Sequence, residues 1–332
     1  MQLEHSMRLA VIIVNYRTPE LTVDCLASLV GQCDANRDRV FVVDNASGDG
    51  STARIPDAIA ANGWGRWVQF QSASLNGGFA VGNNLVLRSL LASSDPPRYV
   101  FLLNPDTIVQ PGAIDALLEF MELHPDVGIA GSGQEDVSGA PLRAAFRFPT
   151  VVSEIEAGMR LGYLSKLLAA FVVAPLPPTQ PSRTDWVAGA CMLVRREVFQ
   201  RVGLLDEGFF LCFEDVDFCR RAADAGFPCW YVPQSRIIHL VGQASGPRRV
   251  GGRTQRRPAC WFDARRHYFE KHFGVAYRVL ADVGFAFTFL LWRMRRVVQR
   301  KPDADPPYFL IDFLRHSIFG GRRRAAPDIT RS

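Results

Sequence analysis

Two acidic stretches in this 332-residue chain have the residue types and spacing needed for chemistry on a polar ligand. The first is Asn104-Pro105-Asp106, which directly follows the apolar run of residues 99–103. Such a run predicts a buried strand, and open α/β sheets bind ligands outside the carboxyl ends of their strands. Hard divalent cations favour oxygen ligands, and Mg²⁺ often combines few protein ligands with substrate phosphates. Asp106 is therefore a candidate for holding a metal or a hydroxyl, with an Asx turn as the alternative.

The second stretch places Glu214, Asp215 and Asp217 at the start of a predicted helix over residues 214–226, after the apolar sequence FFLCF. Complementation of the helix dipole explains one or two of these acids, but hardly all of them. Burial beside apolar side chains raises the pKa of a carboxylate, and a carboxylate with a raised pKa can serve as a general base. The stretch therefore predicts a base.

Polar residues also follow another predicted strand. Asp44 and Asn45 end the apolar run of residues 40–43. A side chain at this place can bond a nucleoside base or a ribose, and a turn stabilised by Asx side chains explains it equally well. His239 likewise ends the strand-like sequence RIIH, where both a structural role and a contact with a metal or phosphate are open.

The stretch NGGFAVGNN, which begins at Asn76, contains a cluster of glycines. It matches neither the GxGxxG pattern nor the Walker pattern, so the glycines alone are a weak signal. Its amides, which include Asn83, are more informative, because helix capping explains one of them and hardly three.

The elements that must position these residues follow from hydrophobic periodicity. The apolar runs of residues 9–15 and 40–43 predict two buried strands, joined by a helix that begins near Pro19. This order of strand, helix and strand predicts a βαβ unit of a parallel sheet. Further strands are predicted at 67–70, 99–103, 127–130, 186–195, 229–232 and 236–239. Residues 142–168 show no clean period, and residues 261–273 and 277–298 have helical patterns.

The charge of the chain is unevenly distributed. The formal net charge is +5, but residues 246–332 hold 19 Lys and Arg against 7 Asp and Glu, which leaves the preceding part net acidic. The seven cysteines are scattered without a CxxC motif, which favours reduced thiols, a cytosolic setting and no zinc site. No signal pattern is expected at the N-terminus.

Residues 283–298 read VGFAFTFLLWRMRRVV, an apolar stretch shorter than a membrane span that runs into a basic cluster. This pattern is typical of a helix that lies in a membrane interface, and a core helix with a solvated basic end is the alternative. No nucleic-acid-binding motif accompanies the charge, so a nucleic-acid partner is not expected.

Together these stretches resemble the family 2 glycosyltransferases with the GT-A fold, within them the bacterial rhamnosyltransferase-like branch. The resemblance covers residues 8–245 and is carried, in the order of the family, by VIIVNYRTPE, VVDNASGDGS, NGGFAVGNN, LLNPD, DWVAGACMLVRREVF, VGLLDEGFFLCFEDVDFCRR and RIIH. It implies an α/β fold with a Rossmann-like, mostly parallel central sheet flanked by helices, followed by a helical basic C-terminal appendage.

The resemblance also implies roles for residues of this chain. Asn104-Pro105-Asp106 stands at the family's DXD motif, with Asn104 in place of the first Asp, so that Asp106, Asn104 and His239 would hold Mg²⁺ or Mn²⁺. Asp215, in the pair with Glu214, would be the catalytic base. The residues expected on the donor side are Asn15, Tyr16, Asp44, Asn45, Asn76, Gly78, Phe79, Asn83, Asn104, Asp106, Arg248 and Arg249. Those expected on the acceptor side are Trp186, Gly189, Ala190 and Asp217.

The implied function is inverting transfer of a sugar, L-rhamnose from dTDP-L-rhamnose, to a hydroxyl of a bacterial cell-surface glycan precursor. The expected partners are the nucleotide sugar, a lipid-linked or oligosaccharide acceptor and a membrane surface, and a homo-oligomer is left open. The setting would be cytoplasmic, at the inner face of the bacterial cytoplasmic membrane. The alternatives are a UDP- or GDP-sugar donor, a non-catalytic scaffold, and a nucleotidyltransferase, for which the first strand lacks the expected Arg-containing glycine-rich loop.

The expected domain organisation has three parts. Residues 1–245 form the catalytic domain, with a donor half over about 7–130 and an acceptor half over 131–245. Residues 246–258, rich in Gly and Arg, form a flexible loop whose arginines close over the donor diphosphate. Residues 259–332 form the helical basic region that associates with a membrane.

Overall fold

The computed structural model describes residues 7–240, 249–250 and 253–318. The chain divides into two compact units, and each is treated by itself below. The first comprises residues 1–146, 176–207 and 214–245, and the second comprises residues 147–175, 208–213 and 246–332. The expected catalytic domain, residues 1–245, is thus shared between the two units, because two internal segments join the C-terminal region.

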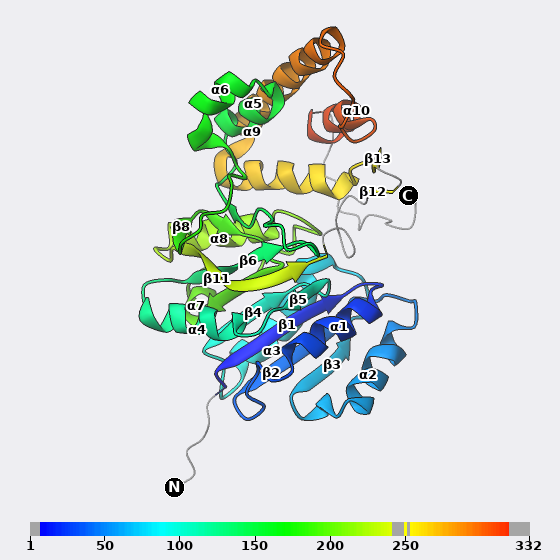
Figure 1. Cartoon of the computed structure of the whole chain (residues 1–332), viewed down its shortest axis with the longest axis vertical. Coiled ribbons are helices and arrows are strands. Elements are labelled where there is room, and N and C mark those ends of the chain that lie inside the picture. Colours follow the sequence, from blue (N-terminus) through cyan, green and yellow to red (C-terminus); the bar gives the residue numbers. More distant parts are fainter. Residues whose placement is uncertain (1–6, 241–248, 251–252, 319–332) are drawn as a thin grey trace. The chain divides into compact units, whose positions relative to one another are not determined.

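The first unit contains one large twisted sheet (Figure 1). Within the described residues its strand order is β3 (Val68–Ser72), β2 (Asp38–Asp44), β1 (Leu9–Asn15), β4 (Tyr99–Leu103), β10 (Cys191–Arg195), β6 (Ile129–Glu135), β11 (Cys229–His239) and β5 (Thr107–Val109), and β8 (Ser182–Thr184) pairs with β11. A separate pair joins β7 (Ala145–Phe146) to β9 (Trp186–Val187).

Strand direction decides where the polar residues lie. Strands β3, β2, β1 and β4 are parallel to one another, and β6 and β11 form a second parallel pair. Strand β10 lies between these groups and is antiparallel to both of its neighbours. All six parallel strands therefore end at one edge of the sheet, and β10 begins there. The expectation of a mostly parallel α/β sheet is confirmed.

Helices cover both faces of this sheet. The helices α1 (Pro19–Leu29), α2 (Ser51–Ala61) and α4 (Ala113–Leu123) share one apolar core with alternate residues of β1, β2 and β4. Helix α3 (Gly78–Ala92) lies against the other face, where a Cβ atom on Gly82 would come within 2.7 Å of Val14 Cγ1. Glycine at this position lets the backbone of α3 approach β1 closely. The remaining helices of the unit are α7 (Arg196–Val202) and α8 (Glu214–Asp224).

The structure differs from the predicted elements at several places. Residues 229–239 form one strand with an irregularity between Val232 and Arg236, because β6 pairs with both halves. The segment predicted as a single strand over residues 186–195 is divided by a turn, in which Cys191 N donates to Ala188 O at 3.2 Å. Strand β5 was not expected, because a strand of three residues leaves no periodic pattern.

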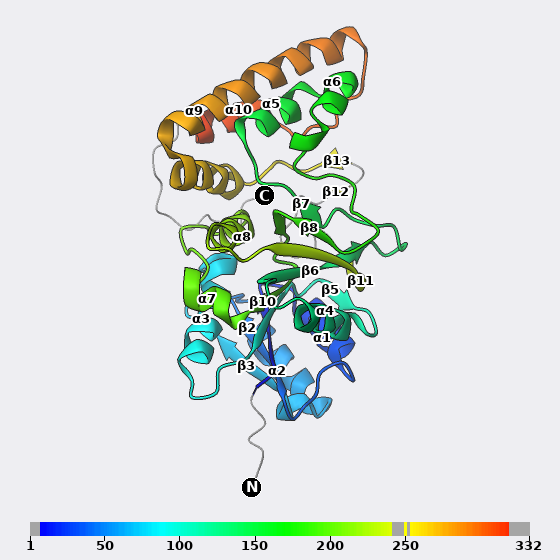
Figure 2. The same ribbon diagram turned by 90° about the vertical axis from the view of Figure 1, so that its left-hand side faces the viewer.

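The second unit is helical (Figure 2). It contains α5 (Val151–Met159), α6 (Gly162–Leu167), α9 (Ala259–Val298) and α10 (Phe309–Phe313), with a pair of two-residue strands, β12 (Arg249–Val250) and β13 (Arg253–Thr254). Helices α5 and α6 occupy the region for which the sequence shows no period. Helix α9 is broken at Gly274, which has φ 83° and ψ 169°, so the expected division into two helices is confirmed.

A buried ion cluster ties α9 to α5. The Arg265 guanidinium donates to Asp282 Oδ1 at 2.5 Å and to Glu154 Oε2 at 2.9 Å. The other oxygen of Asp282 accepts from Arg278 Nη1 at 2.8 Å, and the side chains of Arg265 and Asp282 are each 1% exposed. Charges withdrawn from water to this degree persist only when they are paired.

We predict that Asp282→Asn destabilises the second unit by about 3–5 kcal/mol, because it removes the buried anion that Arg265 and Arg278 share and leaves Arg265 with Glu154 as its carboxylate partner. Asp303→Asn is the matched control, since Asp303 is also paired with an arginine but is 41% exposed, and it should cost less than about 1 kcal/mol. Denaturant unfolding, with amide hydrogen exchange of α9 as the probe, measures the change in stability for both substitutions. Equal effects of the two substitutions would show that the cluster adds no stability through burial.

Candidate functional site

The candidate site is the edge of the first unit at which the parallel strands end. Asn15 and Asp44 are the last residues of β1 and β2, and His239 is the last residue of β11. Asn104 follows β4, and Gln134 is next to last in β6. The start of β10 adds Gly189 and Ala190 to the same edge, because Cys191 pairs with Leu103. Most of the residues expected from the sequence are thus brought to one edge.

Asn15 and Asp44 form a buried network at this edge. Asn15 Nδ2 donates to Asp44 Oδ1 at 2.7 Å, and Asn15 Oδ1 accepts from the hydroxyls of Thr18 and Thr22 at 3.1 and 3.0 Å. Asp44 also accepts from the backbone and hydroxyl of Ser47 at 3.1 and 2.5 Å. Both Asn15 and Asp44 are fully buried. These bonds fix the loops after β1 and β2. For Asp44 this is the turn stabilised by an Asx side chain that the sequence left open, whereas the sequence did not indicate a structural role for Asn15.

Asn45 holds the turn that leads into α3. Its Nδ2 donates to Asn76 Oδ1 at 2.9 Å and to Gly78 O at 3.0 Å. Asn76 Oδ1 also accepts from Gly78 N at 3.0 Å, and Gly78 has φ 82°, a left-handed conformation that glycine adopts without steric cost. The amides expected on the donor side therefore shape the loop itself.

The remaining amides of this stretch lie within α3. Asn83 Nδ2 donates to Phe79 O at 2.9 Å, whereas Asn83 Oδ1 is buried and has no hydrogen-bond partner among the residues that the structure describes. Asn84 bonds to both backbone groups of Leu205 at 2.8 and 3.2 Å, and its Nδ2 also donates to Glu207 at 2.9 Å. Asn84 thereby holds the segment that precedes α8.

Asp106 and His239 form the pair predicted for a metal. His239 Nε2 lies 3.4 Å from Asp106 Oδ1, and Asp106 is 2% exposed. Two backbone features bring them together: His239 pairs with Thr107 across β11 and β5, and Leu240 N donates to Asp106 O at 2.9 Å. The short unexpected strand β5 is thus what places the carboxylate beside the imidazole.

A residue that sequence reasoning missed orients the imidazole. Gln134 is buried, and its Oε1 lies 2.9 Å from His239 Nδ1. An amide oxygen accepts, so Nδ1 carries a proton, and in the neutral imidazole Nε2, which faces Asp106, is then the nitrogen with the lone pair. Partners of this kind fix the tautomer and orientation of metal-binding histidines. A glutamine inside a strand carries no sequence signal for this role.

Asn104 connects this pair to β10. Its backbone N donates to Ala190 O at 3.0 Å, and its carbonyl accepts from Thr107 Oγ1 at 2.7 Å. Within the described residues, no hydrogen bond engages its side-chain amide. In the described chain no three or more His, Cys, Asp and Glu side chains are arranged so that they could hold a metal ion together. A carboxylate and an imidazole nitrogen that face each other, with a free amide oxygen nearby, nevertheless fit a divalent ion that takes its other ligands from a diphosphate and water.

Asp215 lies at the start of α8 and meets β10 through Gly189. Its Oδ2 accepts from Gly189 N at 3.0 Å, and its Oδ1 accepts from Val216 N at 2.8 Å. A Cβ atom on Gly189 would lie 3.1 Å from the Phe79 ring, so Gly189 leaves room for this ring beside Asp215. Burial raises the pKa of Asp215, and the two backbone donors partly oppose the rise.

Glu214 differs from its neighbour. Glu214 is 6% exposed, and within the described part of the chain its Oε2 has no hydrogen-bond partner. Burial, and then repulsion from Asp215, raise the pKa of Glu214 well above the ordinary range of a carboxyl group. Of the two adjacent acids, Glu214 has the surroundings that favour the neutral form more strongly.

The other expected residues are placed as follows. Asp217 is fully buried and binds Arg221 Nε at 2.9 Å, which explains this acid as part of the helix packing. The Trp186 ring stacks on the Phe146 ring, with 4.1 Å between the ring centroids. The Cζ atom of Arg17 lies 5.1 Å from the centroid of the Tyr16 ring. Arg249 lies in β12 of the second unit, and Arg248 lies outside the described residues.

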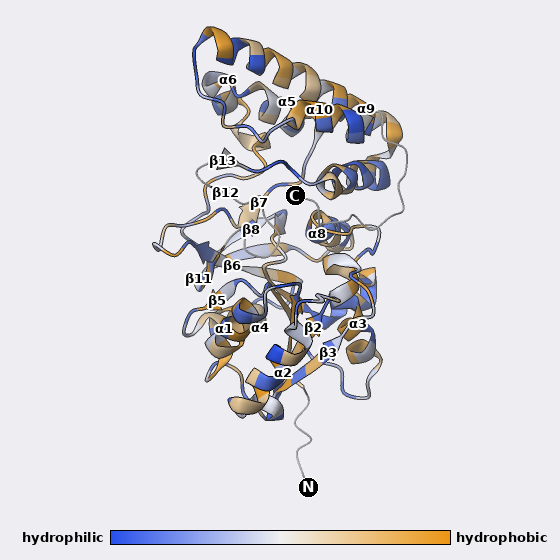
Figure 3. Ribbon diagram, turned by 90° about the vertical axis from the view of Figure 1, so that its right-hand side faces the viewer, coloured by the Kyte–Doolittle hydropathy of each residue, from blue (hydrophilic) through white to orange (hydrophobic). Residues whose placement is uncertain are grey.

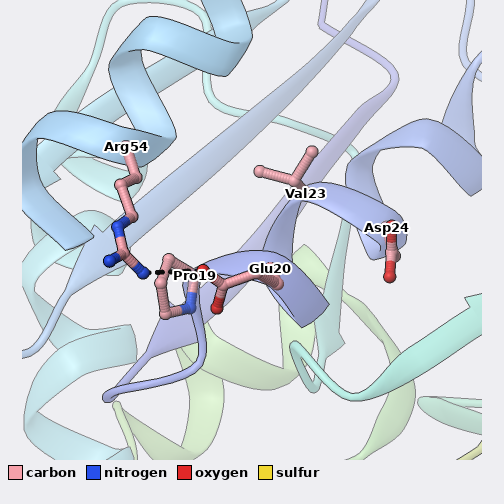
Figure 4. Close-up of a pocket in the computed structure, with 5 residues that line it drawn as sticks. All are labelled: Pro19, Glu20, Val23, Asp24 and Arg54. Atoms are coloured by element: carbon pink, nitrogen blue, oxygen red, sulfur yellow. Dashed lines mark hydrogen bonds and ion pairs between the residues drawn. The ribbon is translucent and has the colours of Figure 1, made fainter. Parts of the chain in front are cut away.

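A separate depression lies between α1 and α2 (Figure 4). It is lined by Pro19, Glu20, Val23, Asp24 and Arg54. Arg54 Nη1 binds Glu20 Oε1 at 2.7 Å across it, and both side chains are well exposed. None of the residues expected at the site lines this depression, so it adds nothing to the chemistry above.

Comparison with known proteins gives a consistent result. A sequence model of the family described as "Glycosyltransferase like family 2" matches residues 6–268. The N-acetylglucosaminyl-diphospho-decaprenol L-rhamnosyltransferase of Mycobacterium tuberculosis is 29% identical over 225 residues, covering 62% of this chain and 68% of that protein. Rhamnosyltransferase WbbL of Escherichia coli K12 is 29% identical over 170 residues, covering 49% and 61%.

Two further similarities are informative. The dTDP-rhamnosyl transferase RfbF of Shigella flexneri is 28% identical over 65 residues, covering 20% of this chain and 22% of that protein. The crystal structure of GalNAc-T7 with UDP, GalNAc and Mn²⁺ has a TM-score of 0.58 at 15% identity, covering 95% of this chain and 57% of that chain. At this identity the structural match establishes a shared fold, which confirms the expected GT-A architecture.

We predict that Glu214→Gln changes how the stability of the protein depends on pH. Because the pKa of Glu214 is raised in the folded state, the folded protein binds more protons than the unfolded chain between the ordinary pKa of about 4.3 and the raised value. The free energy of unfolding therefore falls as pH rises through this window. Glutamine does not ionise, so the variant lacks this decrease. In denaturant unfolding between about pH 5 and pH 8, the free energy of unfolding of the variant should increase relative to that of the parent as pH rises.

The control is Glu119→Gln, which replaces an exposed carboxylate of α4. Its unfolding curves should follow those of the parent at every pH. If the curves for Glu214→Gln also run parallel to the parent, Glu214 is ionised in the folded protein.

Proposed function

The chain belongs to the family described as "Glycosyltransferase like family 2" and is a glycosyltransferase, and we propose that it transfers L-rhamnose from dTDP-L-rhamnose to a hydroxyl of a bacterial cell-surface glycan precursor, with inversion. The donor is supported by relatives named as rhamnosyl transferases, one of them as a dTDP-rhamnosyl transferase. The acceptor is supported by a relative whose name states a sugar diphospho-decaprenol.

One observation carries the proposal: two hydrogen bonds, each donated by a backbone N–H, join the Asp106 segment to Asp215 through Ala190 and Gly189. Asn104 N donates to Ala190 O at 3.0 Å, and the neighbouring Gly189 N donates to Asp215 Oδ2 at 3.0 Å. A candidate binding site for a diphosphate and a candidate base therefore adjoin on one sheet edge. Sugar transfer to a hydroxyl needs this combination of a group that stabilises the leaving diphosphate and a group that accepts the proton.

We assign Asp106, His239 and Asn104 as the residues that would hold a divalent cation on the donor diphosphate. The GalNAc-T7 structure contains Mn²⁺, and the donor set of this chain suits either Mg²⁺ or Mn²⁺. A cation bound there would offset the negative charge that builds on the diphosphate as the sugar leaves. Gln134 would keep His239 in the tautomer that can act as a ligand.

Asp215 acts as the base in this proposal. An acceptor hydroxyl oxygen attacks the anomeric carbon as the bond from that carbon to the diphosphate oxygen breaks, and the hydroxyl proton passes to an Asp215 oxygen. Attack from the side opposite the leaving group inverts the configuration. The two backbone donors orient the carboxylate, and the raised pKa makes it a stronger base than an exposed aspartate. Phe79 packs against Gly189 and would border the sugar.

The donor side would be formed by the loops after β1 and β2 and the start of α3. Asn15, Asp44 and Asn45 are already engaged in bonds that shape these loops. They would therefore present backbone and oxygen atoms in fixed positions to the nucleotide, as expected for a preorganised site. We place the reaction in the cytoplasm, since all seven cysteines are free thiols.

A UDP-sugar is the second candidate donor, because the structural neighbour was solved with UDP. The experiment that tests the proposal incubates the purified chain with dTDP-L-rhamnose and a panel of UDP- and GDP-sugars, each with Mg²⁺ or Mn²⁺, and measures released nucleotide diphosphate. Metal-dependent release from dTDP-L-rhamnose alone supports the proposal. Release from another sugar would replace the donor, and calorimetry that finds no binding of any donor would favour the scaffold reading.

We predict that Asp215→Asn lowers the rate of sugar transfer about 10²–10⁴-fold, because asparagine cannot accept the proton. The substitution keeps the side-chain shape, so donor binding measured by calorimetry should change little. Asp224→Asn is the matched control: Asp224 lies on the same helix, its side chain is 61% exposed and it binds Arg220. Parental turnover by Asp215→Asn would rule out Asp215 as the base.

A further prediction concerns Gln134. Gln134→Leu should raise the Mn²⁺ concentration that donor binding requires about 10–100-fold, because the imidazole loses the partner that fixes its tautomer and binds the metal more weakly. Calorimetric titration of the donor at several Mn²⁺ concentrations measures this shift without requiring turnover. Gln200→Leu, at an exposed position on α7, serves as the control. An unchanged Mn²⁺ requirement in Gln134→Leu would mean that His239 is not oriented by Gln134 for metal binding.

A further inference from the structure

The second half of α9 exposes an apolar face along its length, which is unusual for a helix packed against a protein. Large apolar side chains between residues 275 and 298 are strongly exposed, for example Phe287 at 61% and Met294 at 61%. The others of this exposed set are Val275, Val279, Leu280, Val283, Leu290, Leu291, Val297 and Val298. Figure 3 shows the hydrophobic residues of α9 in orange.

These side chains form one continuous stripe. At about 100° per residue they fall within an arc of about 160°, whose other positions are the small residues Ala276 and Ala286 and, at one edge, Arg293. Arg293 is the one charged residue of positions 275–298 on that arc. At about 1.5 Å per residue the stripe is about 35 Å long. Monomeric proteins rarely leave an apolar surface of this extent in contact with water, so the stripe marks an interaction surface.

The opposite side of the same helix is buried within the second unit. Phe285 and Phe289 join Phe262 and Phe313 in an apolar core. Thr288 packs on α5, where a Cβ atom added to Gly158 would lie 2.3 Å from Thr288 Oγ1. Asp282 lies on this side too, in the ion cluster with Arg265. The helix therefore has one face committed to protein and one face left for a partner.

Basic groups border the stripe at its C-terminal end. At the same 100° spacing, Arg293 falls at one margin of the arc and Arg295 lies about 40° beyond the other margin. Arg293 is bound to Asp303, whereas Arg295 donates to the carbonyls of Met159 and Arg160. Among the described residues, Arg295, Arg300 and Lys301 form no ion pair with a carboxylate. The local charge thus suits a partner that is apolar at depth and anionic at its surface.

We propose that this stripe docks on an anionic lipid bilayer, with α9 lying in the plane of the interface. An apolar face bordered by arginines is the pattern by which helices insert shallowly among lipid headgroups, and cations near the surface strengthen binding to anionic lipid. The proposal concerns binding alone and stands whether or not the sugar donor is the one named above.

Length and composition alone would also allow α9 to cross a membrane, since the helix has 40 residues and contains an apolar stretch of 18 residues, of which 28% is buried inside the protein. Its structure argues against this. Gly274 breaks the helix, and the face opposite the stripe carries Asp282 and Arg278 in a cluster held by α5. Ion pairs are costly inside a bilayer, and a spanning helix would have to leave this packing.

The test measures co-flotation of the full chain with vesicles of phosphatidylcholine containing about 30% phosphatidylglycerol, and with vesicles of phosphatidylcholine alone. The parent should float with the anionic vesicles and bind the neutral ones more weakly. The triple variant Phe287→Ser, Leu290→Ser and Met294→Ser should lose at least about tenfold in partition coefficient, because each serine removes apolar area that the lipid would bury.

The matched control replaces exposed apolar residues of the first unit, as Leu123→Ser, Val137→Ser and Leu176→Ser, whose side chains are 69%, 77% and 80% exposed. It should bind vesicles like the parent, and both triple variants should keep the thermal unfolding of the parent, since only exposed positions change. Arg300→Gln with Lys301→Gln should weaken binding to anionic vesicles and leave binding to neutral vesicles unchanged.

Three results would overturn the proposal. Equal flotation of the stripe variant and the parent would show that the stripe does not bind lipid. Absence of flotation together with dimerisation that the stripe variant abolishes, measured by light scattering, would show that a second copy covers the stripe. Retention of the chain in cell membranes after alkaline carbonate extraction would show that α9 spans the bilayer.

Discussion

The candidate site depends on one feature of the sheet, the antiparallel strand β10 between two groups of parallel strands. A sheet made only of parallel strands would have brought only strand ends to this edge. Because β10 runs the other way, the edge also receives its beginning, and Ala190 O accepts from Asn104 N at 3.0 Å. The next residue, Gly189, then offers its backbone N–H to Asp215. Without β10, helix α8 would have no backbone link to the segment of Asp106.

Buried hydrogen bonds separate the residues that build the edge from those left to act on a ligand. Asn15 and Asp44 are fully buried and bonded at both ends of their side chains, so they are already satisfied by the protein. Among the described residues, Asn83 Oδ1 and Glu214 Oε2 are buried without a hydrogen-bond partner, and the Asn104 side chain makes no hydrogen bond. Unsatisfied buried groups cost stability, and proteins keep them mainly where a function requires them.

The sequence was sufficient to predict the strands that form the middle of the sheet and the residues at their ends. Residues 9–15 and 99–103 are continuous apolar runs, and each is followed by a polar residue, which is a strong local signal. The fold class and the family followed from these runs and their motifs. The break in α9 at Gly274 lies between the two helices predicted over residues 261–273 and 277–298.

Other features depend on contacts that local sequence does not encode. Strand β5 has three residues and exists because β11 pairs with it from far along the chain. Gln134 is one buried amide in a strand, and its role appears only when β6 lies beside β11. The same holds for Asn84, whose partners lie 121 residues or more away in the sequence. The exposed stripe on α9 required knowing which face α5 and α10 cover.

The two adjacent carboxylates show how the fold can give neighbours different roles. Glu214 and Asp215 are both withdrawn from water, and two anions so close together are unfavourable. Asp215 receives a backbone N–H on each oxygen, which favours its charged form. Glu214 Oε2 receives none, so a proton shared by the pair lies preferentially on Glu214. Glu214 can then stay buried as a neutral acid, and its neutrality removes the repulsion that would otherwise oppose ionisation of Asp215. The acid without a partner thus helps its neighbour to remain the anion that a base must be.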